Sequence, residues 1–234
     1  MLVGFSTKSY LSHRDVMEWL DAAATPDTAG VTRFVVPSAP SLREAKEKAG
    51  NRFLIGAQNC STHPSGPHTG EISAEYLAGI GVDFVELGHA EQRRRGDTSE
   101  TVARKVGQAQ LHALDVLLCV GEEENLSPES AAAHCVRQIE SSGADPTRLV
   151  IAYEPVWAIG AAEAAPARHV IDTVTAIRQH LAGWTTPIIY GGAAGAGLLE
   201  QLYPTLEGIF LGRRAHDPSV FNRVVEEAGS LSRA

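Results

Sequence analysis

The feature that most constrains the fold is a series of eight short apolar segments that recur along the chain about thirty residues apart. Each segment is rich in Val, Ile, Leu and Phe and is short, which is typical of a buried strand. A spacing of about thirty residues is the length of one strand–helix–strand step. The eight segments are residues 2–5, 33–36, 53–57, 84–87, 116–120, 149–153, 187–190 and 208–211.

The segments between these runs have the apolar spacing of amphipathic helices. Two of them begin with a capping residue followed by proline, which favours a helix start at that point. The helical spacing is found in residues 15–20, 102–107 and 170–177, and the two helix starts are Ser127-Pro128 and Asp217-Pro218.

Eight strand–helix units in one chain predict a (β/α)8 barrel. The alternative is a doubly wound open sheet, which usually has fewer strands and often a GxGxxG turn after its first strand. No such turn follows Phe5. Because the chain contains no linker and no low-complexity segment, residues 1–234 are expected to form a single barrel domain.

Composition and charge narrow the possible partners and the cellular compartment. A net charge of −8 argues against nucleic acid as a partner. No apolar run approaches the roughly 18 residues of a membrane-spanning helix, and the first residues lack the pattern of a signal peptide. Cys60, Cys119 and Cys135 form no CxxC pair, so a reduced, cytoplasmic setting is expected.

Potentially reactive residues follow the predicted strands, at the end of a barrel where catalytic groups lie. They are Lys8 after the first strand, Gln58-Asn59 after the third, His89 after the fourth, Glu154 after the sixth, Gly191-Gly192 after the seventh and Gly212 after the eighth. Each of them alone is most simply a surface charge, a structural histidine, an ion-pair partner or an ordinary turn. Together they favour a function, because gathering charged groups at one barrel mouth removes water from them, and this free-energy cost is typical of functional sites.

The lysine, the histidine and the glutamate suit proton transfer next to a carbonyl group. A carboxylate such as Glu154 can take a carbon-bound proton, while a neutral imidazole and an ammonium stabilise the enediolate that forms. The loop that follows Glu154 at once can close over it and exclude water. After the last two strands, Gly191-Gly192 and Gly212 let backbone N–H groups approach a phosphate.

Four blocks carry a resemblance to the triosephosphate isomerases that extends over residues 4–218. The most specific is residues 152–160, AYEPVWAIG, which matches the catalytic-glutamate signature of that family residue for residue. Residues 87–93, LGHAEQR, resemble the family's Leu-Gly-His-Ser-Glu-Arg-Arg block. The others are residues 58–60 with 69–73, similar to the long interface loop and its continuation, and residues 189–192, similar to the phosphate loop; residues 119–122 are a less specific fifth match.

The resemblance implies a role for each matching position. Glu154 would be the base, His89 the electrophile and Lys8 the active-site cation, with Glu91 supporting the lysine. A lid would extend over residues 155–166. The implied contacts to a phosphorylated sugar come from Ser6 and from Gly160, Ala193, Gly212 and Arg213 at the phosphate.

The resemblance also implies a homodimer and a reaction without cofactor. The loop of residues 60–69, from Cys60 to Thr69, would form the dimer contact, with Thr69 reaching into the neighbouring subunit. No organic cofactor is expected. No metal is expected either, because no Cys/His/carboxylate cluster in the sequence has metal-ligand spacing.

Several positions depart from the family pattern, and they cluster around substrate positioning. Ser6 replaces the usual asparagine and cannot supply two N–H donors. Ala90 and Ala193 replace serines, and Arg213 follows Gly212 where the family has glycine. The lid ends in residues 161–165, AAEAA, instead of a Thr-Gly-Lys hinge, which is expected to alter its closure.

These departures leave three interpretations open. The first is a divergent triosephosphate isomerase of glycolysis and gluconeogenesis, which interconverts dihydroxyacetone phosphate and glyceraldehyde 3-phosphate. The second is an isomerase of a four-carbon ketose phosphate of the erythrulose phosphate type, for which Ser6 opens room for one more carbon. The third is a catalytically weak barrel that binds a phosphometabolite. The intact Lys8, His89 and Glu154 count against the third, since a binding protein needs no general base.

Overall fold

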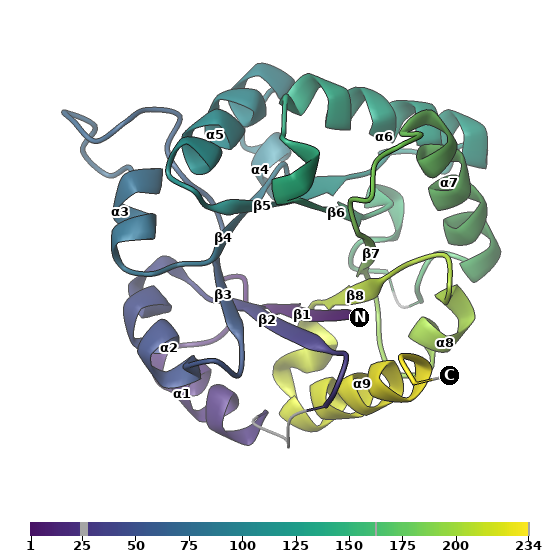
Figure 1. Cartoon of the computed structure of the whole chain (residues 1–234), viewed down its shortest axis with the longest axis horizontal. Coiled ribbons are helices and arrows are strands. Elements are labelled where there is room, and N and C mark those ends of the chain that lie inside the picture. Colours follow the sequence, from purple (N-terminus) through teal and green to yellow (C-terminus); the bar gives the residue numbers. More distant parts are fainter. Residues whose placement is uncertain (24–27, 162, 234) are drawn as a thin grey trace.

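The computed structural model is a closed barrel of eight parallel strands surrounded by helices (Figure 1). It describes residues 1–23, 28–161 and 163–233. Each strand pairs with the next along the chain, and the last pairs with the first. The strands are β1 (Leu2–Ser6), β2 (Thr32–Val36), β3 (Leu54–Ala57), β4 (Phe84–Leu87), β5 (Asp115–Val120), β6 (Leu149–Tyr153), β7 (Ile188–Gly192) and β8 (Gly208–Leu211).

The predicted (β/α)8 fold is therefore confirmed, and each predicted apolar segment forms a strand within two residues of its expected bounds. The open-sheet alternative is wrong, because β1 pairs with β8 and closes the sheet. A closed sheet has no unpaired edge strand, so the backbone hydrogen bonds of all eight strands are made within the barrel.

The helices form the outer layer, with their apolar faces against the sheet. Both predicted helix starts are confirmed: Ser127 caps α6 by accepting from the Ser130 N–H, and Asp217 caps α9 by accepting from the Ser219 N–H. The helices are α1 (His13–Ala22), α2 (Leu42–Ala49), α3 (Ala74–Gly79), α4 (Ala90–Arg94), α5 (Ser99–Leu111), α6 (Pro128–Ser142), α7 (Ala167–His180), α8 (Leu198–Leu202) and α9 (Pro218–Leu231).

The inside of the barrel is filled by large side chains that face glycines. The rings of Phe84 and Phe210 lie 5.5 and 5.4 Å from that of Phe34, centroid to centroid. A Cβ atom on Gly4 would lie 1.9 Å from the Phe34 ring, and one on Gly56 would lie 2.3 Å from Phe84. Because only glycine leaves this room, the three rings pack against one another inside the barrel, beneath the mouth at the carboxyl ends of the strands.

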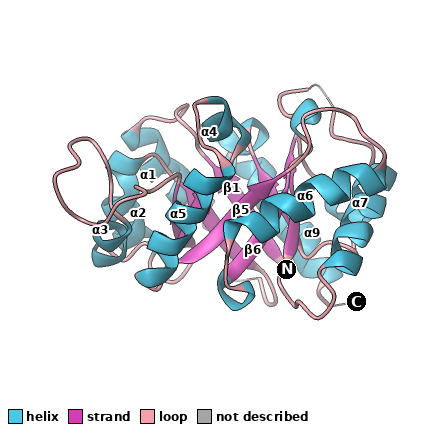
Figure 2. Ribbon diagram, turned by 90° about the horizontal axis from the view of Figure 1, so that it is seen from above, coloured by secondary structure: helices cyan, strands magenta, loops and turns pink. Residues whose placement is uncertain are grey.

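One loop stands away from the barrel. Residues 60–69 extend outward between β3 and α3 in both views (Figures 1 and 2). The base of the loop is closed by the Ser61 N–H, which donates to the Ile72 carbonyl at 2.8 Å. The rings of His63 and His68 stack within it, with their centroids 4.3 Å apart.

In the parts of the chain that the structure describes, no helix combines the length and hydropathy needed to cross a membrane.

Candidate active site

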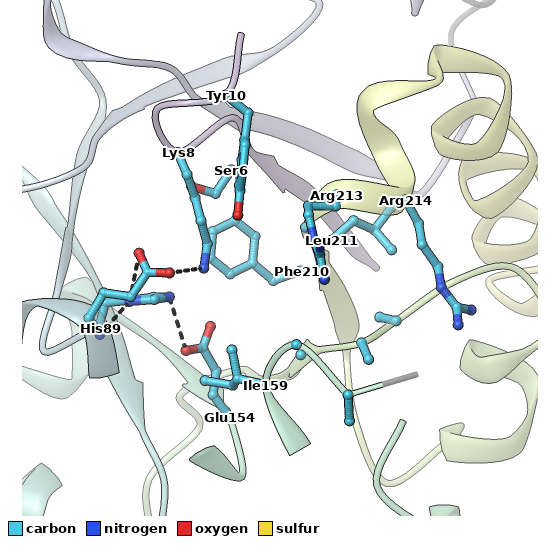
Figure 3. Close-up of a pocket in the computed structure, with 17 residues that line it drawn as sticks. Ser6, Lys8, Tyr10, His89, Glu154, Ile159, Phe210, Leu211, Arg213 and Arg214 are labelled. Atoms are coloured by element: carbon cyan, nitrogen blue, oxygen red, sulfur yellow. Dashed lines mark hydrogen bonds and ion pairs between the residues drawn. The ribbon is translucent and has the colours of Figure 1, made fainter. Parts of the chain in front are cut away.

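The residues singled out from the sequence meet at one mouth of the barrel. A cavity of about 260 Å³ opens at the carboxyl ends of the strands, with the Phe210 side chain in its lining. Figure 3 shows Lys8 and His89 on one side of it, Arg213 and Arg214 on the other, and Glu154 between them. The predicted residues that line it are Ser6, Lys8, His89, Glu91, Glu154, Gly160, Ala193, Gly212 and Arg213.

Glu154 follows β6 directly and is held from the backbone side. Its N–H donates to the Val120 carbonyl at 2.8 Å. Two glycines make room for it: a Cβ on Gly121 would lie 1.8 Å from the Glu154 carbonyl oxygen, and a Cβ on Gly191 would lie 2.5 Å from Oε1 of its carboxylate. The carboxylate is buried, and Oε2 has no hydrogen-bond partner among the described residues. A buried carboxylate with an oxygen free of hydrogen bonds at a cavity is placed to take a proton from a bound ligand.

His89 caps the short helix α4, and this contact decides which ring nitrogen carries the proton. Its Nδ1 accepts a hydrogen bond from the Glu91 N–H at 3.0 Å. A nitrogen that accepts carries no proton, so the ring is neutral and its proton lies on Nε2. Nε2 lies 3.6 Å from Oε2 of Glu154. The imidazole is therefore a hydrogen-bond donor to whatever occupies the cavity next to that carboxylate.

Lys8 lies two residues beyond β1 in a backbone conformation that non-glycine residues seldom adopt, with φ of +46°. Three side chains donate to its carbonyl and hold it there: Ser38 Oγ at 2.7 Å, Gln58 Nε2 at 2.9 Å and Thr7 Oγ1 at 3.2 Å. Its ammonium lies 2.8 Å from Oε1 of Glu91. Strain of this kind persists only where the surroundings impose it, and here it aims Nζ across the mouth (Figure 3).

The contact with Lys8 also favours the charged form of Glu91. Burial alone would raise the pKa of its carboxyl group, but the hydrogen bond and the charge of Lys8 outweigh it. The pKa of Glu91 therefore lies below its ordinary value. The predicted support of Lys8 by Glu91 thus has a direct contact in the structure.

The opposite end of the cavity is lined by small residues and by two arginines. Gly160 and Gly192 have φ of +78° and +139°, conformations that favour glycine. Arg213 and Arg214 belong to the 3₁₀ turn η4 (Arg213–His216) after β8, and both line the cavity. This end combines close backbone approach with positive charge, which suits an anion.

The segment that follows Glu154 is tied down at both ends. Glu122 is fully buried and accepts from the Trp157 indole at 2.8 Å, and its backbone carbonyl accepts from the Val156 N–H at 2.9 Å. At the other end the Ala165 N–H donates to the Tyr190 hydroxyl at 3.2 Å. The predicted lid, residues 155–166, includes residue 162, which lies outside the described residues.

A second cavity of about 240 Å³ continues from the first on the far side of Lys8 and His89. The two share five lining residues, which are Ser6, Lys8, Tyr10, His89 and Glu91. The second is also lined by Gln58, which follows β3, and by Glu86 of β4. The space at the mouth therefore continues beyond the catalytic candidates, on the side opposite to Arg213 and Arg214.

Several lining residues were not predicted as site residues from the sequence, among them Glu86, Tyr10 and Arg214. Glu86 had a signal, because it is a charged residue inside an apolar strand segment, two positions after the inward-facing Phe84. Tyr10 lies four residues after the end of β1 and is largely exposed. No sequence pattern marks Tyr10 or separates Arg214 from Arg213.

The charge state of Glu86 predicts a pH effect on stability. Burial raises the pKa of Glu86 to about 7 from its ordinary 4.5. Between these values the folded protein keeps a proton that the unfolded chain has released, so the contribution of Glu86 to stability becomes less favourable as the pH rises. Relative to the parent, the Glu86→Gln variant should gain stability from pH 5 to pH 8, by on the order of 3 kcal/mol.

Urea unfolding of both proteins at pH 5, 6, 7 and 8 measures this difference in the free energy of unfolding. A difference that does not change with pH contradicts the expected titration of Glu86 in this window.

The comparison with known proteins agrees with the fold. The triosephosphate isomerase family model matches residues 1–228. The chain is 38% identical to an L-erythrulose-1-phosphate isomerase of Pectobacterium atrosepticum, over 99% of this chain and 97% of the relative. It is 37% identical to a protein of the same name from Brucella abortus, over 86% of this chain and 83% of the relative. It is 39% identical to a triosephosphate isomerase of Synechococcus, over 77% of this chain and 75% of the relative.

These matches confirm the resemblance found in the four sequence blocks, and they extend it over almost the whole chain. The barrel, the residues gathered at its mouth and the match to residues 1–228 together show that the chain belongs to the triosephosphate isomerase family of sugar-phosphate isomerases.

Proposed function

We propose that this chain isomerises a four-carbon ketose phosphate of the erythrulose phosphate type through an enediolate. The observation that carries this proposal is the continuation of the cavity past Ser6, Lys8 and His89. A three-carbon sugar phosphate ends at its reacting carbons and has nothing to place there. The relative from Pectobacterium, named an L-erythrulose-1-phosphate isomerase, supports the proposal because its match covers nearly the full length of both chains.

In the proposed mechanism Glu154 takes the proton from the hydroxyl-bearing carbon next to the carbonyl. His89 donates from Nε2 to the oxygens of the enediolate, and the ammonium of Lys8 stabilises their negative charge. His89 gives its Nε2 proton to the former carbonyl oxygen and takes up the proton of the hydroxyl group, while Glu154 returns its proton to the neighbouring carbon, so that the carbonyl moves by one position. The neutral tautomer of His89 suits this task, because its Nε2 proton can be donated to the enediolate oxygens while the ring carries no positive charge.

The phosphate is proposed to lie at the opposite end of the cavity. Backbone N–H groups at Gly160, Ala193 and Gly212 would bind its oxygens, and Arg213 would add a charged contact. Closure of residues 155–166 would bring Gly160 to the phosphate and exclude water. This arrangement fixes the direction of the substrate, with its phosphate toward Arg213 and its sugar carbons toward Lys8.

Triose phosphate interconversion, the first interpretation from the sequence, is the second candidate. It is supported by the triosephosphate isomerase of Synechococcus among the relatives and by the presence of Lys8, His89 and Glu154. The weak binding protein is disfavoured by the same three residues, since binding alone gives no reason for a buried carboxylate with a free oxygen.

A substrate panel separates these candidates, with kcat/KM measured on erythrulose 1-phosphate, dihydroxyacetone phosphate and glyceraldehyde 3-phosphate. We expect four-carbon turnover to exceed triose turnover by at least about 10-fold, the effect of roughly 1.4 kcal/mol in the transition state. The Ser6→Asn variant should reverse this order, because the longer side chain fills the space beside the reacting carbons. The matched control is Ser9→Asn, because Ser9 is an exposed residue that also lines the second cavity.

Efficient turnover of the triose phosphates alone would replace the proposal with the second candidate. Absence of turnover on all three compounds would favour the binding protein. An unchanged order in Ser6→Asn would remove Ser6 from substrate selection.

A homodimer in the cytoplasm, without metal or organic cofactor, completes the proposal. The loop of residues 60–69 supports the dimer, since it projects from the barrel with Thr69 exposed near its end. Size-exclusion chromatography with light scattering should give about twice the 24.9 kDa chain mass. A single species at the chain mass would contradict the dimer, and replacement of residues 63–68 by a short glycine–serine turn should convert dimer to monomer.

A further inference from the structure

Glu86 is a buried carboxyl group for which the proposed mechanism has no use. It lies on β4 two residues after Phe84, and side chains two apart on a strand point to the same face. Phe84 faces the inside of the barrel, so Glu86 does as well, one level nearer the mouth. Its side chain is 4% exposed, and the surface that remains lines the second cavity.

The protein itself gives the Glu86 carboxyl group little to bind. Among the described residues its hydrogen-bond donor is the thiol of Cys119, with Sγ 3.9 Å from Oε1. A thiol is a weak donor, and a buried carboxyl group without good donors is costly. Burial also raises the pKa of Glu86 to about 7, so near neutral pH the group is able both to accept and to donate a hydrogen bond.

The position of Glu86 relative to the reacting groups is fixed by the shared lining of the two cavities. Lys8 and His89 stand between the arginine end and the second cavity, and Glu86 borders only the second. A substrate with its phosphate toward Arg213 and its reacting carbons beside Glu154 and His89 would extend any further carbon toward Glu86.

The chemistry of erythrulose 1-phosphate supplies such a carbon. Its carbonyl is at C2, and C1 carries a phosphate ester instead of a free hydroxyl group, so the carbonyl can move only to C3. Both reacting carbons therefore lie between the phosphate-bearing C1 and the terminal C4. C4 is a hydroxymethyl group that the three-carbon substrates lack, and it projects away from the phosphate.

We propose that Glu86 determines substrate specificity by hydrogen bonding the terminal hydroxyl group of a ketose phosphate whose carbon chain continues beyond the reacting carbons. The inference rests on the proposed function, because it uses the same orientation of the substrate. Ser6 provides the space for this group, and the carboxyl group of Glu86 provides its partner. The space alone would admit water or a methyl group equally well, whereas the carboxyl group selects a hydroxyl.

The rival explanation is that Glu86 acts only through its neighbours, by its charge on Lys8 and His89. The two explanations differ in one measurable respect. A change in the field at Lys8 and His89 alters turnover of every substrate, while a lost contact to the terminal hydroxyl alters only substrates that carry it.

The experiment compares three substrates on the parent protein and on Glu86→Leu, Glu86→Gln and Cys119→Ala. The substrates are erythrulose 1-phosphate, its 4-deoxy analogue with a methyl group at C4, and dihydroxyacetone phosphate. In the parent, loss of the 4-hydroxyl should lower kcat/KM about 10- to 100-fold, as for a hydrogen bond to a charged group. In Glu86→Leu the two four-carbon substrates should be equal, with dihydroxyacetone phosphate within about 3-fold of the parent.

The other two variants test the chemistry of the contact. Glu86→Gln keeps an acceptor and a donor and should retain most of the preference for the 4-hydroxyl. Cys119→Ala removes the weak thiol contact to Glu86 and changes no residue that lines either of the two cavities, so it should retain most of the preference. Circular dichroism and the inhibition constant of inorganic phosphate establish that each variant is folded with an intact anion site.

The outcomes separate the two proposals. A parent that discriminates against the 4-deoxy analogue while Glu86→Leu does not would support the inference. An equal fall for all substrates in Glu86→Leu, or an unchanged preference for the 4-hydroxyl, would overturn it and leave the four-carbon function standing. A parent without activity on erythrulose 1-phosphate would overturn the proposed function and this inference together.

Discussion

Replacing Glu154 with aspartate should lower kcat by about 10²-fold or more, because the shorter side chain withdraws the carboxylate by about 1 Å from the carbon it deprotonates. Glu154→Gln removes the base and should lower kcat by about 10⁴-fold, at the upper end of what a general base contributes. The rate is measured with saturating substrate, so that the comparison reports the chemical step rather than binding.

The control for both variants is the affinity for inorganic phosphate, measured as a competitive inhibition constant. The carboxylate of Glu154 lies beside His89 rather than at the arginine end of the cavity, so this constant should change by less than about 3-fold (Figure 3). A near-normal kcat in Glu154→Gln would remove Glu154 from its proposed role. A parallel loss of phosphate affinity would show that the variant had disturbed the whole mouth.

Gly121→Ala should cause the largest loss of stability of any single methyl group near the site. The added Cβ would lie 1.8 Å from the carbonyl oxygen of Glu154 and 2.6 Å from its carbonyl carbon. Both are backbone atoms at the exit of β6, and they have no rotamer to change. We expect the free energy of unfolding to fall by about 3 kcal/mol or more, the upper range for overpacking. The displaced backbone of Glu154 should lower kcat as well.

Gly107→Ala is the matched control for this substitution. Gly107 lies in α5 and is exposed, and a Cβ there would meet nothing within 4 Å. Alanine also reduces the entropy of the unfolded chain, so this variant should gain about 0.5–1 kcal/mol and keep its activity. Urea unfolding followed by tryptophan fluorescence measures both variants. Equal stability of Gly121→Ala and the parent would contradict the close approach of the two backbones.

The strands were predictable because each one is an isolated apolar segment with a polar or helical stretch on either side. Buried parallel strands give near-continuous apolar runs, and a closed barrel buries all of its strands in this way. The largest error in strand bounds falls on β7, where the apolar run of residues 187–190 ends before the strand does. The last two residues of β7 are Gly191 and Gly192, which have no hydrophobic signal and pair with β8 through the backbone alone.

The candidate site was predictable for a different reason. In a barrel, residues that follow strands lie at one end whatever their distance in the sequence. Lys8, His89 and Glu154 could therefore be placed together before any geometry was known. Glu86 was missed because it lies within a strand rather than after one, and its charge inside an apolar segment marks it as unusual without telling which face of the strand it occupies.

By itself the sequence determined the number and order of the strand–helix units, the family, and the meeting of Lys8, His89 and Glu154 at one end of the barrel. These follow from local apolar patterning and from the order of residues along the chain. Tertiary structure alone decided which oxygen of Glu154 is free, which nitrogen of His89 carries the proton, and how far the cavity extends past Ser6 toward Glu86. Those properties depend on close contacts between residues far apart in the sequence, and the positions of such atoms are fixed only when the whole barrel has closed.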